Sequence, residues 1–233
     1  MIPANIIFIK GHDKSTQLAE QCKASCEKYA IKHTMVPGVT PETLLAYEMH
    51  YPLKPLMNSR AWDYEKQNQP MLANKKSCFL NHVLFWKRVI ANDTPMIFLE
   101  HDALALRPMD KIEFDELLVL NMDSAFRHNK NLWKKHKGSY IYKNQKPVLR
   151  PLESSLKYWK ANLFNGSICV PGTASYAVTP KGAKRLWDSV WKNGWDQSDF
   201  FINSKNVNIE YVDPDVFGFN GVNLQTSKGF GNV

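Results

Sequence analysis

The 233-residue chain lacks the short signatures of several large enzyme classes. It has no GxxxxGK[ST] phosphate-binding loop, no GxGxxG after its first apolar run, no HExxH pair of zinc ligands and no GxSxG nucleophile turn. These absences move the commonest nucleotide hydrolases, dinucleotide enzymes, zinc proteases and serine hydrolases out of the leading candidates.

The chain also has little cysteine and no long hydrophobic run. Its cysteines, Cys22, Cys26, Cys78 and Cys169, are too few and too irregularly spaced for a disulfide framework or a zinc cluster, so we expect reduced, buried thiols. The N-terminus lacks a charged segment followed by a long apolar one, and no apolar run is long enough to span a bilayer. The sequence therefore predicts a soluble protein in the cytoplasm, or one peripheral to a membrane surface.

Acidic residues are missing from one segment. The net charge is 30 − 22 = +8, and residues 124–152 contain eight basic side chains and no Asp or Glu, so this segment carries the whole excess. Aromatic residues such as Trp133 and Tyr140 are interleaved with the cations and can stack on sugars or bases. Two interpretations stay open: a site for an anionic partner (phosphate, an acidic glycan or nucleic acid), and a solvated loop.

What is present predicts a single α/β domain. An apolar fraction of 44% is ordinary for a globular protein, and neither repeats nor a low-complexity linker divide the chain. Residues 5–10 form a β-branched apolar run, and Leu18, Cys22 and Cys26 then recur at helical spacing in a helix capped by Asp13 or Ser15. A second strand at 34–36 completes a strand–helix–strand unit, which is typical of a mostly parallel sheet flanked by helices.

The same alternation continues along the chain. After a mostly irregular stretch at 41–76, with one short helix near 42–49, residues 79–90 predict an amphipathic helix, 92–95 a turn and 96–99 a buried strand. Further short strands are expected at 117–120, 168–170, 175–178 and 207–212. Between them, Thr179 as the cap and Pro180 at the first position predict a helix to about residue 191.

Two carboxylates follow the strand at 96–99. On an extended strand Glu100 and Asp102 would share one face, with His101 on the other. Oxygen ligands at the carboxyl end of a strand suit Mg²⁺ or Mn²⁺, held by one or two carboxylates together with substrate phosphates. The alternative is a pair of solvated acids at a strand end.

Asp196 and Asp199 lie beside apolar residues directly after the helix at 180–191. Burial against Trp195 and Phe200 would raise the pKa of such a carboxylate towards working pH, as a general base requires. The alternative is two acids in a surface turn.

Three segments, taken in order, resemble glycosyltransferase family 25, the lipopolysaccharide and collagen galactosyltransferase-like enzymes. The first is Cys78-x-Leu80-Asn81-His82 with Trp86-Lys87, leading into Glu100-His101-Asp102, which is similar to the family's Glu-Asp-Asp. The second is Gly172-Thr173-Ala174-Ser175-Tyr176 and the helix after it, and the third is Gln197-Ser198-Asp199-Phe200-Phe201. The chain departs from the family pattern at His101, which replaces the middle acid, and at Asn81, which replaces serine.

The resemblance implies a GT-A-like (Rossmann-like) fold and the inverting transfer of a hexose, galactose or glucose, from a nucleotide sugar such as a UDP-sugar. The acceptor would be a glycan or another hydroxyl compound, including an anionic one. The implied domain spans residues 1–233, with a basic, aromatic insertion at about 124–160 that would choose the acceptor.

The resemblance also implies roles for individual residues. Glu100 and Asp102 would hold Mn²⁺ or Mg²⁺ on the donor diphosphate, and Asp199, with Asp196 as the second candidate, would deprotonate the acceptor. Two further residues, Thr173 and Tyr176, would contact the sugar. The nucleotide would be contacted by Lys10, Gly11 and His12.

Two competing hypotheses come from other classes. The basic segment together with clustered acids also fits a nucleic-acid-binding protein or a metal-dependent nuclease, whose affinity would fall steeply with salt. A transferase-like domain that has lost turnover and is kept for binding is the second.

Overall fold

The computed structural model describes residues 2–67, 71–109, 111–122, 148–151, 163–164, 167–170 and 172–219. Its centre is a seven-stranded sheet with the order β2-β1-β3-β9-β5-β10-β6. The strands are β1 (Ala4–Phe8), β2 (His33–Pro37), β3 (Met96–Glu100), β5 (Leu117–Val119), β6 (Val148–Pro151), β9 (Ser175–Val178) and β10 (Ile209–Asp213). Of the expected insertion at 124–160, only 148–151 lie within the described residues.

The sheet is mixed and mostly parallel. β1 pairs in parallel with β2 and β3, and β5 pairs in parallel with β10, whereas β9 is antiparallel to both of its neighbours and β6 is antiparallel to β10. Five strands therefore run one way, and β9 and β6 run the other. The α/β class and the mostly parallel sheet expected from the sequence are confirmed.

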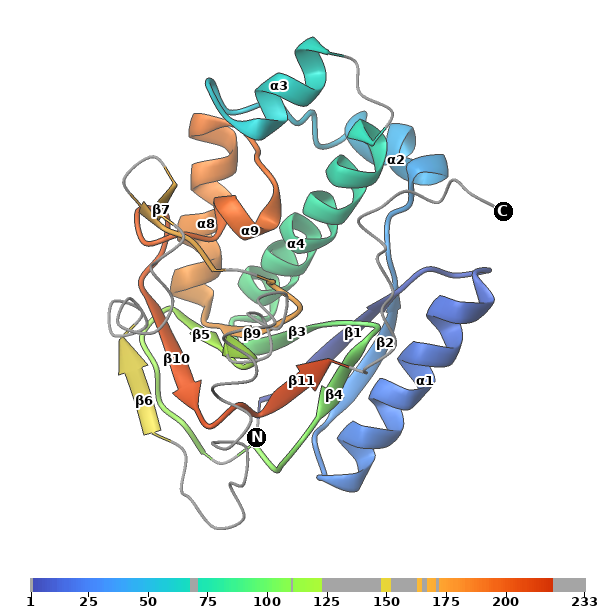
Figure 1. Cartoon of the computed structure of the whole chain (residues 1–233), viewed down its shortest axis with the longest axis vertical. Coiled ribbons are helices and arrows are strands. Elements are labelled where there is room, and N and C mark those ends of the chain that lie inside the picture. Colours follow the sequence, from blue (N-terminus) through green and yellow to red (C-terminus); the bar gives the residue numbers. More distant parts are fainter. Residues whose placement is uncertain are drawn as a thin grey trace, which may run out of the picture.

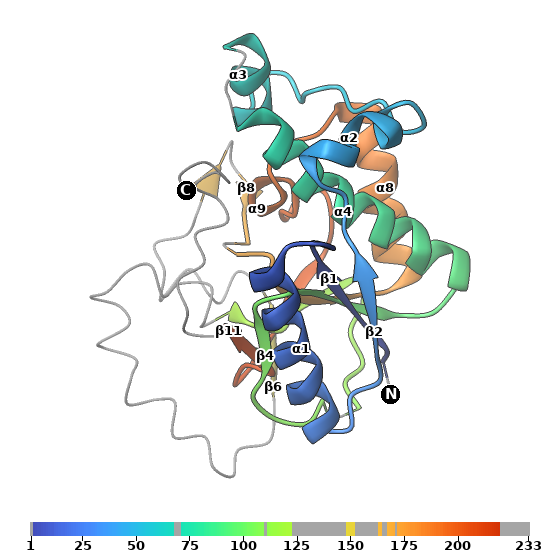
Figure 2. The same ribbon diagram turned by 90° about the vertical axis from the view of Figure 1, so that its right-hand side faces the viewer.

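Helices cover both faces of this sheet (Figures 1 and 2). On one face lies α1 (Asp13–Lys28), next to the two-stranded ribbon of β4 (Ala103–Ala105) and β11 (Phe217–Phe219). The other face carries α2 (Pro41–Glu48), α3 (Arg60–Lys66), α4 (Leu72–Asn92), α8 (Pro180–Asn193) and α9 (Ser198–Phe201). A second ribbon joins β7 (Leu163–Phe164) to β8 (Ser167–Ile168).

Side-chain alternation along the strands divides the core into two layers. In β3, Met96 and Phe98 pack with α4 and α8, whereas Ile97 and Leu99 pack with α1. The other buried strands alternate in the same way, which explains why they are apolar at nearly every position. Glu100 has the parity of Met96 and Phe98, so its side chain leaves the sheet on the α4 side.

Helix α4 is fixed on the sheet by a buried chain of polar contacts. Trp86 Nε1 donates to the hydroxyl of Tyr176 on β9 at 2.9 Å, and this hydroxyl lies 3.0 Å from Nδ1 of His82. An indole can only donate, so the arrangement in which every group has a partner is the one where the Tyr176 hydroxyl accepts from Trp86 and donates to Nδ1 of His82. The His82 ring also stacks on Phe98 of β3 with centroids 4.1 Å apart, so rotation of α4 about its axis is tightly restricted.

The helix ends show which local sequence signals were sufficient to predict a cap. Thr179 caps α8 by accepting from the backbone N–H of Gly182, with Pro180 at the first position, as predicted. The cap of α1 is different: His12 Nδ1 accepts from the N–H of Ser15, and Asp13 is the first helical residue, so the predicted caps Asp13 and Ser15 were wrong. Helix α3 was missed, because seven residues are too few to establish a period.

Gly182 provides a direct test of how closely α8 packs on the sheet. A Cβ at this position would lie 2.4 Å from the carbonyl oxygen of Glu116, a main-chain atom that cannot move aside cheaply. We expect Gly182→Ala to lower the free energy of unfolding by about 1–3 kcal/mol in urea denaturation, despite the higher helix propensity of alanine. The matched control Lys184→Ala, exposed on the same helix, should change it by about 0.5 kcal/mol at most. A Gly182→Ala variant as stable as the wild type would contradict this packing.

Candidate active site

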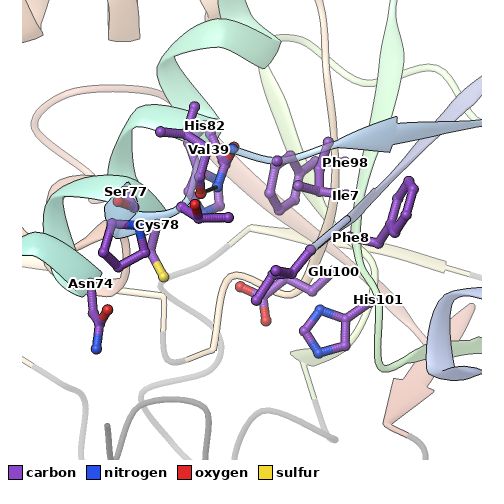
Figure 3. Close-up of a pocket in the computed structure, with 15 residues that line it drawn as sticks. Ile7, Phe8, Val39, Asn74, Ser77, Cys78, His82, Phe98, Glu100 and His101 are labelled. Atoms are coloured by element: carbon purple, nitrogen blue, oxygen red, sulfur yellow. Dashed lines mark hydrogen bonds between the residues drawn. The ribbon is translucent and has the colours of Figure 1, made fainter. Parts of the chain in front are cut away.

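A pocket lies at the carboxyl ends of β1, β2 and β3 (Figure 3). Its walls come from the last residues of β1, the segment after β2, the end of β3 and one face of α4. The α4 residues recur at helical spacing: Asn74, Ser77, Cys78, Asn81 and His82. Ligands of open α/β sheets bind at this edge, so the pocket is the leading candidate for the donor site.

Asn81 holds the wall that follows β2. Its Oδ1 accepts from the backbone N–H of Val39 at 2.7 Å, and its Nδ2 donates to the carbonyl of the same residue at 3.2 Å. Glycine at position 38 allows the close approach of Asn81, because a Cβ there would lie 3.0 Å from Ile7 and 3.2 Å from Asn81. The asparagine that departs from the family serine therefore shapes the pocket.

Glu100 is the last residue of β3 and lines the pocket, as the strand parity requires. Its N–H donates to the carbonyl of Ala174 at 2.8 Å, which fixes the end of the strand. Burial, followed by the charges of Asp102 and Asp199, raises the pKa of Glu100 to about 8. The charges of Asp102 and Asp199 therefore both oppose ionisation of Glu100.

The predicted alternation of residues 100–102 was wrong. β3 ends at Glu100, and residues 101–102 form a turn, so strand geometry no longer directs the side chains. His101, expected to point away, lines the same pocket as Glu100 (Figure 3). Burial is also the main cause of a raised pKa at Asp102, partly offset by His101.

The described residues contain no group of three or more His, Cys, Asp or Glu side chains arranged to hold a metal ion. Glu100 and Asp102 nevertheless fit a divalent cation that is shared with a diphosphate. Asp102 Oδ1 is buried and has no hydrogen-bond partner, and its charge acts with that of Asp199 against ionisation of Glu100. One or two carboxylates with phosphate oxygens is a common way of holding Mg²⁺.

Asp199 reaches the same region from α9. Its Oδ1 accepts from the backbone N–H of Thr173 at 3.1 Å and from the Thr173 hydroxyl at 3.2 Å. Burial raises the pKa of Asp199, while the bonds from Thr173 and the charge of Lys75 act in the opposite direction. The predicted pair of Thr173 and Asp199 is thus brought together, with Thr173 orienting the acid.

Asp196 has a different environment. It is 1% exposed, and its Oδ1 accepts from the N–H of Ala61 at 3.2 Å and from that of Gln197 at 2.8 Å. Ala61 lies in the first turn of α3, where free N–H groups attract a carboxylate. The bonds of Asp196 therefore connect the segment before α9 to α3.

Of the other residues predicted to contact the donor, some lie near the pocket and one lies in the core. Tyr176 is 1% exposed and its hydroxyl contacts Trp86 and His82, so it lies in the core and not among the residues that line the pocket. Lys10, Gly11 and His12 follow β1 just beyond Ile9, the last β1-side residue that lines the pocket. His12 caps α1 and lies near enough to His101 to act on its charge.

The sequence reasoning missed two residues at this site. Cys78, expected to be buried, is exposed, and its sulfur faces the Glu100 carboxylate across the pocket (Figure 3). Although the residue as a whole is exposed, the surrounding protein desolvates the Cys78 thiol, and together with the charge of Glu100 this raises its pKa to about 11, so the thiol is neutral at neutral pH. Lys75 acts electrostatically on Cys78, Glu100 and Asp199. The available signal was spacing: residues 74, 75 and 78 precede Asn81 and His82 at helical intervals.

The family model for glycosyltransferase family 25 (LPS biosynthesis protein) matches residues 5–202. The chain belongs to this family. It is therefore a glycosyltransferase, and its family implies a nucleotide-sugar donor and an acceptor. The matched region contains the pocket, the acids of residues 100–102 and Asp199.

Comparison with solved structures finds two further transferases. One is a glycosyltransferase involved in the glycosylation of the major capsid of the virus PBCV-1, with 8% identity, a TM-score of 0.36, and coverage of 86% of this chain and 72% of that one. The other is mouse xyloside xylosyltransferase 1 in its apo form, with 9% identity, a TM-score of 0.37, and coverage of 86% and 79%. Curated proteins give no significant match. Within the described residues, no helix is both long enough and apolar enough to cross a membrane.

Burial of His82 predicts a dependence of stability on pH. Burial lowers the folded-state pKa of His82 to about 3, whereas the unfolded value is close to 6.5. As pH falls, His82 is therefore protonated in the unfolded chain at a higher pH than in the folded protein. The free energy of unfolding consequently decreases between about pH 6.5 and pH 3, by at most about 1.4 kcal/mol per pH unit.

Urea denaturation of the wild type and His82→Gln across this range isolates the effect, because other groups titrate in both proteins. We expect the difference between their unfolding free energies to shrink with falling pH. A difference independent of pH would show that His82 is not held neutral.

Proposed function

We propose that this single-domain glycosyltransferase transfers a hexose, galactose or glucose, from a UDP-sugar to a hydroxyl group of a glycan or similar acceptor, with inversion and with the help of Mn²⁺ or Mg²⁺. The observation that carries the proposal is that Glu100 lines the pocket formed by β1, β2 and β3 and that the charges of Asp102 and Asp199 both act on it. Family membership supplies the reaction class, and these acids supply the two functions it needs.

The pocket has the composition expected of a nucleoside site. Ile7, Val39 and Phe98 give it apolar walls, while Asn74 and Ser77 provide polar groups from α4. The acids lie where the strands end, so a nucleoside between β1, β2 and α4 would direct its phosphates towards Glu100.

Asp102 and Glu100 would hold the divalent cation. When bound, the ion would offset negative charge on the diphosphate as the nucleotide departs. Burial is the main cause of the raised pKa of Glu100, and the charges of Asp102 and Asp199 add to it; a bound cation would offset these charges, so the acids and the cation stabilise each other.

Asp199 would act as the general base. The acceptor oxygen attacks the anomeric carbon, its proton passes to the Asp199 carboxylate, and the bond from that carbon to the diphosphate oxygen breaks with its electron pair leaving on the nucleotide. A single displacement inverts the configuration at this carbon. Thr173 would keep the carboxylate in place through its two bonds to Oδ1.

The acceptor specificity is proposed to reside in the basic, aromatic segment at 124–160, which lies almost entirely outside the described residues. The eight cations at 124–152 favour an anionic glycan. Membership of a glycosyltransferase family weighs against the nucleic-acid or nuclease hypothesis, which rested on the same cations.

We expect Asp102→Ala to abolish the metal-dependent part of donor binding, because it removes a buried ligand oxygen. Isothermal titration with UDP in the presence and absence of Mn²⁺ measures this part directly. Asp188→Ala, which removes an exposed acid on α8, is the matched control and should bind like the wild type. Equal Mn²⁺-dependence in Asp102→Ala and wild type would exclude Asp102 as a ligand.

Asp199→Asn should bind the donor normally and lose turnover by about 10²–10⁴-fold, the usual contribution of a general base. The matched variant Asp196→Asn should keep turnover and lose stability, because its carboxylate bonds α3. Product formation and thermal unfolding of both variants separate the two roles. Full turnover by Asp199→Asn, or loss of turnover in a fully folded Asp196→Asn, would reverse the assignment.

A further inference from the structure

Two adjacent lysines of α4 have different environments. Lys76 Nζ forms ion pairs of 3.0 Å with both Glu48 and Glu65, and so connects α4 to α2 and α3. Lys75 Nζ makes no ion pair or hydrogen bond with any described residue, although it is only partly exposed. A partly buried cation without an anionic partner is costly to keep unless something else compensates it.

Helical geometry places Lys75 beside α4 residues that adjoin the two parts of the active site. Three residues later, Cys78 faces Glu100 in the pocket (Figure 3). Four residues later, Phe79 packs edge-on against Phe201 of α9, with ring centroids 4.9 Å apart, and α9 also carries Asp199. Since positions i+3 and i+4 flank position i on a helix face, Lys75 departs from the side of α4 that carries Cys78 and Phe79. Lys75 itself is not among the residues that line the pocket.

The electrostatics agree with this placement. The charge of Lys75 partly offsets the raised pKa of Glu100, of Asp199 and of Cys78, which belong to three different elements. Lys75 is therefore near the place where the donor phosphates would meet the proposed cation and the acceptor would meet the base.

We propose that Lys75 binds the diphosphate of the nucleotide-sugar donor directly, as the protein's own cation at the leaving group. This inference rests on the proposed function, because it requires a nucleoside diphosphate in the pocket. Once a divalent cation compensates Glu100 and Asp102, Lys75 is left to pair with phosphate oxygens. The same contact would stabilise the negative charge that develops when the sugar–phosphate bond breaks.

Titration of four proteins with UDP and with uridine, at saturating Mn²⁺, tests the inference. The proteins are the wild type, Lys75→Met, Lys75→Arg and Lys76→Met. Methionine keeps an apolar stem of similar length, arginine keeps the charge, and Lys76→Met removes an identical charge one residue away. Thermal unfolding is measured for each protein.

We expect Lys75→Met to weaken UDP binding about ten- to hundredfold while leaving uridine affinity nearly unchanged, because uridine has no phosphate. Lys75→Arg should keep most of the UDP affinity. Lys76→Met should lower the unfolding temperature and bind UDP like the wild type, since the Lys76 charge is already paired with Glu48 and Glu65.

The outcomes distinguish the inference from the proposed function. UDP binding by Lys75→Met equal to that of the wild type, or an equal loss of UDP and uridine, would overturn the role of Lys75 while leaving the donor site intact. A wild type that binds neither ligand would contradict the proposed UDP-sugar donor itself, and the inference would fall with it.

Discussion

The hydrogen bond from Trp86 to Tyr176 joins α4 to the middle of the sheet, and the active site depends on it. With His82 as the third member and Phe98 stacked beneath its ring, the contact fixes both the height and the rotation of the helix. A helix rotated by one residue, about 100°, would turn its pocket face away from the strand ends. The core contact therefore decides which α4 side chains can meet a ligand.

Carboxylates that look alike in the sequence have different roles because their local environments differ. Asp196 and Asp199 are three residues apart, yet Asp196 receives N–H groups from α3 and its own neighbour, while Asp199 is oriented by Thr173 next to the pocket. Burial raises the pKa of both. A raised pKa alone does not identify a catalytic base, because a buried structural carboxylate has it too. The distinguishing feature is what the acid faces.

Much of the fold followed from the sequence where one physical signal dominated. Helices α4 and α8 have long apolar periods, α8 has a proline and a capping threonine, and β3 is a buried run between a turn and an acid. Because these are local properties, the amino-acid pattern was enough to place the end of β3 and its carboxylates at the carboxyl edge of the sheet. The motif order then connected them to Asp199.

The errors came where the answer depended on distant contacts. The direction of β9, which the sequence left open, is set by its pairing with β3 and β5, which no local period reports. Strand alternation was applied to residues 100–102, beyond the predicted strand at 96–99, whereas the chain turns directly after Glu100. Tyr176 looked like a pocket residue in its motif, but its partners lie ninety residues away on α4. Lys75 differs from Lys76 only through the neighbours that α4 acquires in the fold, and the sequence does not show these.

The balance of charge at the pocket constrains the order in which its occupants bind. Glu100, Asp102 and Asp199 place up to three negative charges near one site, and of the described lysines Lys75 is the one whose charge acts on both Glu100 and Asp199. A free diphosphate adds further negative charge, and Lys75 alone would not offset all of it. A divalent cation bound by the acids replaces repulsion between the acids and the diphosphate with attraction between the cation and the phosphates. Donor and cation should therefore bind with positive coupling, and since coupling of this kind is reciprocal, UDP should raise the affinity for Mn²⁺ as much as Mn²⁺ raises the affinity for UDP.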